Sequence, residues 1–174
     1  MKLNIGMPAS MEDILKSRED RVTHQRELLE KYKKPIISLT INIPGDIKLT
    51  KNSIVIFDAA ISAISSELGD NVVFLEKYYH ISGCQAYYVV DMTAHMLKKK
   101  TCLIEESHFL GRLMDADVID LSGRHLSRKD IGVLERRCLI CDEKAAICAR
   151  SRRHSTDELL ATIDELVAQW EKTI

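Results

Sequence analysis

Two aspartates one residue apart, Asp115 and Asp117, stand in the otherwise apolar run GRLMDADV. If this run is a β-strand, its side chains alternate between two faces, so both carboxylates lie side by side on one of them. Adjacent carboxylates repel each other unless a cation lies between them, and Mg²⁺ is a hard cation that prefers such oxygen ligands. The pair therefore indicates a magnesium site, although a half-exposed strand with two solvated acids accounts for the same pattern.

A second group of metal-ligand residues lies in the C-terminal third of the chain. Cys138 and Cys141 form a C-x2-C pair, and Cys148 and His154 follow at short intervals. Three thiolates and an imidazole are a ligand set for tetrahedral Zn²⁺. Cysteine is also among the most often buried residue types, so thiols packed in a core are the alternative interpretation.

The same part of the chain is basic. Residues 124–153 contain nine Lys and Arg against four Asp and Glu, a local charge of +5 in a chain whose net charge is −1. This excess indicates an anionic ligand, an acidic protein partner or a solvated basic surface. Two isolated residues fit an anionic ligand as well. His108, close to the aspartate strand, could orient a phosphate or accept a proton, or it could be a structural histidine. Lys48 follows the Pro44-Gly45 turn, which could bind phosphate or be a plain loop.

The composition is that of one folded domain. With 174 residues, 45% of them hydrophobic and 29% charged, the chain can bury a core and is not a disordered polypeptide. No apolar run is long enough to cross a bilayer and the N-terminus has no signal-peptide pattern, so we expect no membrane association and a cytoplasmic location. Five cysteines, an odd number, favour reduced thiols or metal ligands over disulfides.

The elements that must position these residues follow from hydrophobic periodicity. Residues 11–33 predict an N-terminal helix whose apolar stripe is interrupted at Arg18 and Gln25, as in a helix with a polar seam toward a site or in a plain surface helix. An α+β core is expected over residues 35–128 and a Cys-rich helical part over residues 136–174. Within the core the sequence predicts a strand over 36–43, a helix over 52–68, strands over 72–79 and 85–91, a helix over 93–107, the aspartate strand, and a hairpin to residues 125–128.

This order of strands and helices is the split βαβ pattern of ferredoxin-like α+β folds. We therefore expect one antiparallel sheet with helices on a single face. A C-terminal helical extension should follow, with helices over residues 142–150 and 155–172, the second beginning at a capping box of Ser155 and Glu158.

Several short motifs, in order, carry a resemblance that extends from Arg18 to about Leu160. They are P-G-x-I-K from Pro44, E-x-x-H-x-x-G-R-L-x-D-x-D-V from Glu105, S-R from Ser127, R-R-C-L-x-C from Arg136, and C-A-R from Cys148 with a histidine after it. In these motifs the chain resembles the holo-citrate lyase synthase family, also called apo-citrate lyase phosphoribosyl-dephospho-CoA transferase. The resemblance implies a nucleotidyltransferase that attaches the prosthetic group of 2′-(5-triphosphoribosyl)-3′-dephospho-CoA to a serine of the citrate lyase acyl carrier subunit and releases pyrophosphate.

The motifs of the resemblance and the chemistry of the side chains together suggest roles for individual residues. Asp115 and Asp117 would hold Mg²⁺, with Glu105 as a third acidic ligand and Asp91 as its alternative, and the serine proton would pass to one of these carboxylates or to His108. Substrate-binding residues would be Arg18, Arg21, Lys48, Arg112, Arg128, Arg136 and Arg137. The Cys138, Cys141, Cys148 and His154 set would hold structural Zn²⁺.

A function of another class fits part of the same evidence. A zinc knuckle beside a basic segment is also found in nucleic-acid-binding modules. Such modules stack bases on exposed aromatic side chains, and the arginines of residues 124–153 have no aromatic residues among them. We therefore expect the transferase, with the acyl carrier subunit and the dephospho-CoA derivative as partners and no nucleic acid.

Overall fold

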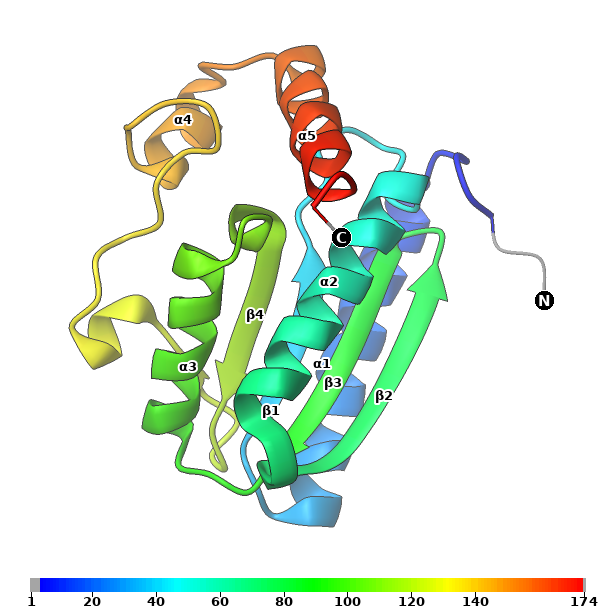
Figure 1. The fold of residues 1–174 in the computed structure, drawn as a ribbon. Coiled ribbons are helices and arrows are strands. Elements are labelled where there is room, and N and C mark those ends of the chain that lie inside the picture. Colours follow the sequence, from blue (N-terminus) through cyan, green and yellow to red (C-terminus); the bar gives the residue numbers. More distant parts are fainter. Residues whose placement is uncertain (1–3, 174) are drawn as a thin grey trace.

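A five-stranded antiparallel sheet with the strand order β2-β3-β1-β4-β5 runs through the computed structural model, which describes residues 4–173 (Figure 1). The helices and strands along the chain are α1 (Met11–Tyr32), β1 (Ile36–Ile41), α2 (Lys51–Leu68), β2 (Val72–His80), β3 (Gly83–Val90), α3 (Ala94–Ser107), β4 (Met114–Ile119), β5 (His125–Leu126), α4 (Ala145–Ser151) and α5 (Thr156–Trp170). Three short 3-10 helices lie at Gly69–Asn71, Gly111–Leu113 and Arg128–Ile131. The predicted order of strands and helices is confirmed.

Side chains that cap free backbone N–H groups set where the helices begin. In α1 the Ser10 hydroxyl accepts a hydrogen bond from the Asp13 N–H, and the Asp13 carboxylate accepts one from the Ser10 N–H. Ser155 and Glu158 form the same reciprocal pair at the start of α5, as predicted. Such capping boxes satisfy N–H groups that have no partner within the helix.

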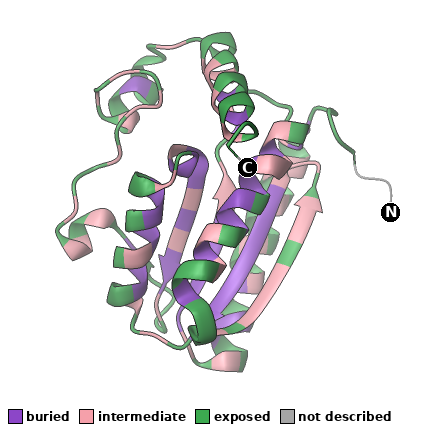
Figure 2. Ribbon diagram, in the orientation of Figure 1, coloured by how far each residue is buried: buried purple, intermediate pink, exposed green. Residues whose placement is uncertain are grey.

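The main core lies between the sheet and the helices α2, α3 and α5. Ile37 and Leu39 of β1 are fully buried there against Phe57 and Ile64 of α2. Figure 2 shows this burial on the inner side of α2 and along β3. None of the helices within residues 4–173 is both long and apolar enough to span a membrane.

The expectation of helices on a single face of the sheet is wrong, because α1 covers the opposite face (Figure 1). Leu28 and Leu29 of α1 pack there against Ile36, Tyr87 and Val89 in a second core cluster. At this end of the sheet β1 and β3 carry apolar residues on both faces, and a strand that is apolar on both sides needs cover on both. The sheet therefore lies between two helical layers, and α1 packs Leu28 and Leu29 against the strands.

The C-terminal part departs from the prediction at its first helix. The chain forms a tight hairpin from Arg136 to Ala145, in which the Cys138 N–H donates to the Glu143 carbonyl (2.7 Å) and the Ala145 N–H donates to the Arg136 carbonyl (2.9 Å). These bonds take up the residues that were expected to start a helix at 142, so α4 begins only at Ala145. α5 agrees with the prediction to within two residues.

Candidate active site

Polar side chains form a row across the α1 face of the sheet. Asp115 of β4 lies opposite Thr40 of β1, and Thr40 lies opposite Gln85 of β3. Asp117 lies opposite Ser38, one pleat further along β4. Met114, Ala116 and Val118 point the other way into the main core, which confirms that the two aspartates share one face. The alternation of β4 thus places both carboxylates on the side where α1 lies.

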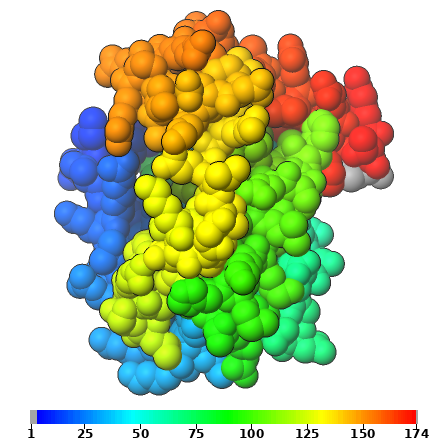
Figure 3. All heavy atoms as spheres, turned by 90° about the vertical axis from the view of Figure 1, so that its left-hand side faces the viewer, coloured from blue at the N-terminus to red at the C-terminus, as the bar shows by residue number. Residues whose placement is uncertain are grey.

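A cavity of about 810 Å³ opens where α1, the end of β1 and the C-terminal hairpin meet. Figure 3 shows a hollow between the blue N-terminal helix, the yellow segment and the orange segment above them. Asp115 is the acidic residue that lines it, and six cationic side chains line it as well: Arg18, Arg21, Lys48, Arg112, Arg136 and Arg152. Five of these six were predicted to bind substrate. This convergence of positive charge from separate elements suits a polyanionic ligand.

The surroundings of Asp115 change its pKa from that of an ordinary exposed aspartate. Burial raises its pKa, and the neighbouring Asp117 carboxylate raises it further. Arg136 acts in the opposite direction, with its Nη2 at 3.4 Å from Asp115 Oδ1. Asp117 has the His125 ring nitrogen Nδ1 at 4.0 Å. A cation bound at Asp115 would relieve the repulsion that raises its pKa.

Glu105 lies behind Asp115 and is 2% exposed. Its Oε1 forms an ion pair with Arg136 Nη2 (2.8 Å) and accepts a hydrogen bond from the Ala116 N–H (3.1 Å), and its Oε2 accepts one from Arg128 Nη2 (2.6 Å). Burial opposes its charge, but Arg136 and Arg128 outweigh that effect and lower the pKa of Glu105. Both oxygens are therefore occupied by cations and a backbone donor, which favours a role in positioning Arg136 over a role as a metal ligand.

Gly111 lets the chain pass close enough to α3 to build this arrangement. A Cβ at this position would stand 2.6 Å from the carbonyl oxygens of Ile104 and Glu105, closer than real Cβ contacts. Only glycine allows the backbone this approach. The next residue, Arg112, thereby enters the cavity beside Arg136.

Two cavity arginines have a donor without a protein acceptor. Within residues 4–173, the Nε groups of Arg21 and Arg112 are buried and make no hydrogen bond. Burial and the neighbouring Arg136 and Arg128 lower the pKa of Arg112. Buried donors of this kind are costly unless a partner is supplied. A bound anion is the partner that the cavity can supply.

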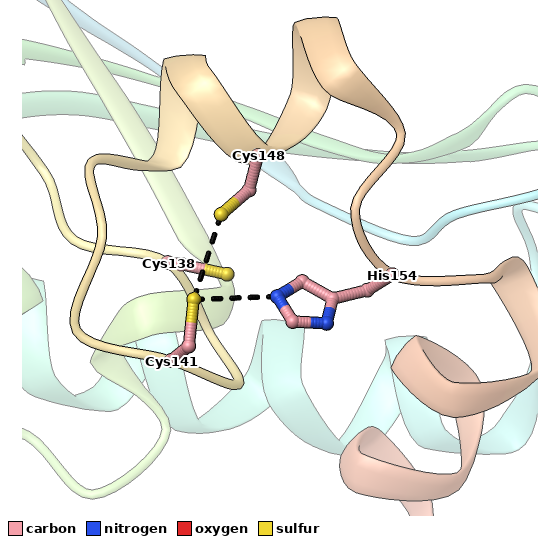
Figure 4. Close-up of side chains that lie close together, drawn as sticks. All are labelled: Cys138, Cys141, Cys148 and His154. Atoms are coloured by element: carbon pink, nitrogen blue, oxygen red, sulfur yellow. Dashed lines mark hydrogen bonds between the residues drawn. The ribbon is translucent and has the colours of Figure 1, made fainter.

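The Cys138, Cys141, Cys148 and His154 side chains come together at the cavity wall (Figure 4). Their ligand atoms all lie within 4.8 Å of one another, and Cys141 Sγ is 3.5 Å from Cys148 Sγ and 3.3 Å from His154 Nε2. Ligands around a tetrahedral zinc with Zn–S distances of about 2.3 Å are about 3.8 Å apart. The cluster therefore has the spacing and donor types of a Cys3His metal site.

Local backbone geometry builds this Cys3His cluster. The hairpin supplies Cys138 and Cys141, α4 supplies Cys148, and Arg152 in the left-handed conformation (φ 49°) turns the chain back so that His154 faces the sulfurs. Burial opposes ionisation of Cys138, but N–H groups of Cys141 and Ile140 lower the pKa of its thiol to about 7. A thiolate available near neutral pH suits metal binding.

Asp117, Glu105 and Cys141 adjoin cavity residues without lining the cavity, and four other candidate residues lie apart from it. The His108 ring packs on Trp170 with ring centroids 4.8 Å apart, and its Nδ1 accepts a hydrogen bond from the Leu110 N–H (3.0 Å). Arg128 is held by Glu105 and Glu106, and Arg137 is 69% exposed near Asp142. Asp91, at the opposite end of β3, pairs with Lys34. These placements favour structural or surface roles.

Some cavity residues were not singled out from the sequence. From the sequence, Arg152 is only one of the cations of the basic segment 124–153. In the structure it lines the cavity, and along the chain it lies between two ligands of the Cys3His cluster, Cys148 and His154. Thr40, Asn42 and Gln85 also line the cavity. The sequence carries a signal for Thr40 and Asn42. Together with Ser38 they alternate with Ile37, Leu39, Ile41 and Ile43, which marks a polar face.

Comparison with known proteins bears on the whole chain. A family model described as apo-citrate lyase phosphoribosyl-dephospho-CoA transferase matches residues 9–170. A protein of Vibrio cholerae serotype O1 (strain M66-2) is 41% identical over 168 residues, covering 94% of each chain, and is named probable apo-citrate lyase phosphoribosyl-dephospho-CoA transferase. A Streptococcus pyogenes serotype M18 protein of the same name is 35% identical over 167 residues, covering 93% of this chain and 87% of that protein.

Proposed function

The chain belongs to the apo-citrate lyase phosphoribosyl-dephospho-CoA transferase family, and from that premise we propose that the cationic cavity is where the transfer takes place. The enzyme transfers the phosphoribosyl-dephospho-CoA prosthetic group to the acyl carrier subunit of apo-citrate lyase. The observation that carries the proposal is that six cationic side chains line the same cavity as Asp115, two of them with buried unpaired donors.

The cationic side chains would bind the phosphates of a triphosphoribosyl donor. Arg21 and Arg112 would donate their unpaired Nε–H groups, and Lys48, whose pKa is lowered by burial, would add a flexible ammonium. Hydrogen bonds between arginine and phosphate are charge-assisted and fix orientation as well as affinity. Phosphoryl and nucleotidyl transfer require mainly such positioning and charge stabilisation.

The bond changes are those of a nucleotidyl transfer. The hydroxyl oxygen of the carrier serine forms a bond to the α-phosphorus, and the bond from that phosphorus to the pyrophosphate oxygen breaks. The serine proton passes to a carboxylate of the Asp115 and Asp117 pair, which acts as the general base. Arg136 and Arg112 stabilise the charge that builds up on the leaving pyrophosphate.

Mg²⁺ fits the chemistry of the aspartate pair. Two carboxylates on one strand face, one of them with a raised pKa, are a donor set that Mg²⁺ uses together with substrate phosphates. When bound, the ion would neutralise phosphate charge and orient the triphosphate. Glu105 would support this site through Arg136 and the Ala116 N–H.

The Cys3His cluster would hold Zn²⁺ as a structural ion. It would tie the hairpin, α4 and the segment before α5 together at the cavity wall, where Arg136 and Arg152 flank it. Closed four-ligand sites of this kind contribute folding free energy.

The acyl carrier subunit would approach over the basic C-terminal third. The local charge of +5 over residues 124–153 would attract an acidic carrier and speed the encounter.

We also propose that the fold contains the split βαβ arrangement of ferredoxin-like folds. The elements that form it are β1-α2-β2-β3-α3-β4, with the strand order β2-β3-β1-β4.

Pyrophosphate release with the apo carrier subunit tests the site. Asp115→Asn and Asp117→Asn should each lower turnover by about 10²–10⁴-fold at saturating Mg²⁺, since each removes one carboxylate of the pair that would hold the ion and accept the proton. Asp70→Asn, an exposed aspartate in the Gly69–Asn71 3-10 helix, is the matched control and should leave turnover unchanged. Wild-type rates in both the Asp115 and the Asp117 variant would refute the assignment.

A further inference from the structure

A second cavity, of about 670 Å³, lies between α1 and the hairpin of β2 and β3. It shares three lining residues, Arg21, Ser82 and Gln85, with the cationic cavity. The two hollows therefore adjoin at the point where α1 crosses β3. No residue of the aspartate strand lines the second cavity, so it is not part of the site described above.

Aromatic rings dominate one wall of the second cavity. Tyr78 and His80 are stacked, with ring centroids 5.7 Å apart and an angle of 17° between the rings. Tyr87 and His24 meet each other edge to face at 4.8 Å and border the same space. The two ring nitrogens of His24 are hydrogen-bonded to the carboxylates of Glu27 and Glu76, which fix the ring there. Flat apolar surfaces with polar edges are what a nucleobase stacks against.

The charge of the second cavity is opposite to that of the first. Asp13, Asp20 and Glu27 line it against only Lys16 and Arg21. Three carboxylates would repel a phosphate group, whereas they can accept hydrogen bonds from an amino group such as the exocyclic amine of adenine. The cavity therefore selects an uncharged, aromatic, amine-bearing group.

The size of the donor requires more than one cavity. Cavities of about 300–1,000 Å³ hold drug-sized ligands, and a phosphoribosyl-dephospho-CoA derivative is larger than these. Such a molecule has an adenine base on a ribose that also carries phosphate groups on two branches. Phosphates in the cationic cavity would leave the base to be placed next to it, near the shared Arg21, Ser82 and Gln85.

We propose that the second cavity binds the adenine base of the dephospho-CoA moiety, with Tyr78 as the principal stacking residue. This inference rests on the proposed function, because it takes the cationic cavity as the phosphate site. Arg21, which lines both cavities, would lie at the ribose between base and phosphates. The base would serve as the anchor that sets which phosphate reaches Asp115.

Calorimetric titration with two separate probes tests the inference. Dephospho-CoA carries the base, and tripolyphosphate carries only the charge. Tyr78→Leu removes the ring but keeps an apolar side chain, and it should weaken dephospho-CoA binding about 5- to 100-fold. The same variant should bind tripolyphosphate like the wild type. Tyr78→Phe keeps the ring, loses only the hydroxyl bond to Glu76, and should restore most of the affinity for dephospho-CoA.

Tyr32→Leu is the matched control. Tyr32 stacks on Phe74 at the other end of α1, with ring centroids 5.2 Å apart, and lines neither cavity. Both Tyr→Leu variants are compared by thermal unfolding, and dephospho-CoA binding should weaken only in the Tyr78 variant. Adenosine should compete with dephospho-CoA for the wild-type protein, whereas pantetheine should not.

The outcomes separate this inference from the proposed function. Unchanged dephospho-CoA affinity in Tyr78→Leu, or competition by pantetheine and not by adenosine, would overturn the adenine assignment and leave the phosphate site standing. Failure of tripolyphosphate to bind the wild-type protein would instead overturn the phosphate site. In that case, weaker dephospho-CoA binding by Tyr78→Leu than by Tyr32→Leu would still assign the base to the second cavity.

Discussion

Replacing Glu105 by Gln tests whether the ion network behind Asp115 is what holds the cavity wall. The change keeps the shape of the side chain but removes the charge that faces Arg128 at 2.6 Å and Arg136 at 2.8 Å. Because Glu105 is 2% exposed, water cannot replace the lost carboxylate. Removing one partner of a buried ion pair costs about 3–5 kcal/mol of unfolding free energy. For a chain of this length the melting temperature should fall by about 6–20 °C.

Glu106→Gln is the control for this experiment. Glu106 is the next residue of α3 and also bonds Arg128 at 2.6 Å, but its side chain is 52% exposed. An exposed pair contributes only about 0–1 kcal/mol, so Glu106→Gln should leave the urea midpoint nearly unchanged. Equal stabilities of the two variants would refute the reasoning. If Glu105→Gln loses affinity for Mg²⁺ but keeps its stability, Glu105 is a metal ligand and does not serve to position Arg136.

The pH dependence of stability gives an independent check on Glu105. Its pKa in the folded protein lies below the ordinary value of 4.5, because Arg136 and Arg128 outweigh its burial. A carboxyl with a lowered pKa adds stability above its unfolded pKa and loses that contribution as the pH falls through the folded pKa. Wild-type stability should therefore drop below about pH 4.5 more steeply than that of Glu105→Gln, as measured by urea unfolding at a series of pH values.

Three further predictions follow from the cavity and its supports. Arg112→Ala should weaken tripolyphosphate binding by about 10- to 150-fold, because it removes a charge-assisted contact worth about 1.5–3 kcal/mol. Arg137 is exposed, so Arg137→Ala should bind tripolyphosphate like the wild type. Equal losses of affinity in the two variants would contradict this prediction. Gly111→Ala should lower the unfolding free energy by about 1–3 kcal/mol, because the new Cβ would overlap two carbonyl oxygens, and urea unfolding measures it. Protein purified without added metal should contain about one zinc per chain by elemental analysis, and chelation of that zinc should lower the melting temperature. If freshly purified, reduced protein contains no zinc, the Cys3His cluster is not a zinc site.

The elements of the fold could be predicted because local signals and hydrophobic periodicity agree. Ser10 and Ser155 mark helix starts that the structure confirms, and the alternation from Ile37 to Ile43 gave the inward face of β1. The placement of α1 could not be predicted in the same way. Its apolar stripe is interrupted by Arg18, which lines the cavity, and by Gln25, which is buried, so the stripe does not show which sheet face the helix covers.

The site could be predicted only as far as residue types and motif order allow. Asp115, Arg136 and the Cys3His cluster do meet at one cavity. The sequence does not show which charges are already paired, and this is what separates Arg112, with its unpaired Nε, from Arg128, which is held by two glutamates. That distinction depends on contacts between α3 and the segment after β4, more than 20 residues apart along the chain.

The contacts of Ala116 also bear on how the protein behaves at high concentration. β4 pairs with β1 along its whole length but with β5 only at Val118 and Ile119, so the rest of β4 would be a free sheet edge. Free edges invite extended segments of other chains to add to the sheet, which is a route to aggregation. Here the Ala116 N–H donates to Glu105, and the Ala116 carbonyl accepts a hydrogen bond from the buried Lys98 (3.4 Å). Two side chains of α3 thus occupy the edge where a foreign strand would have to bind.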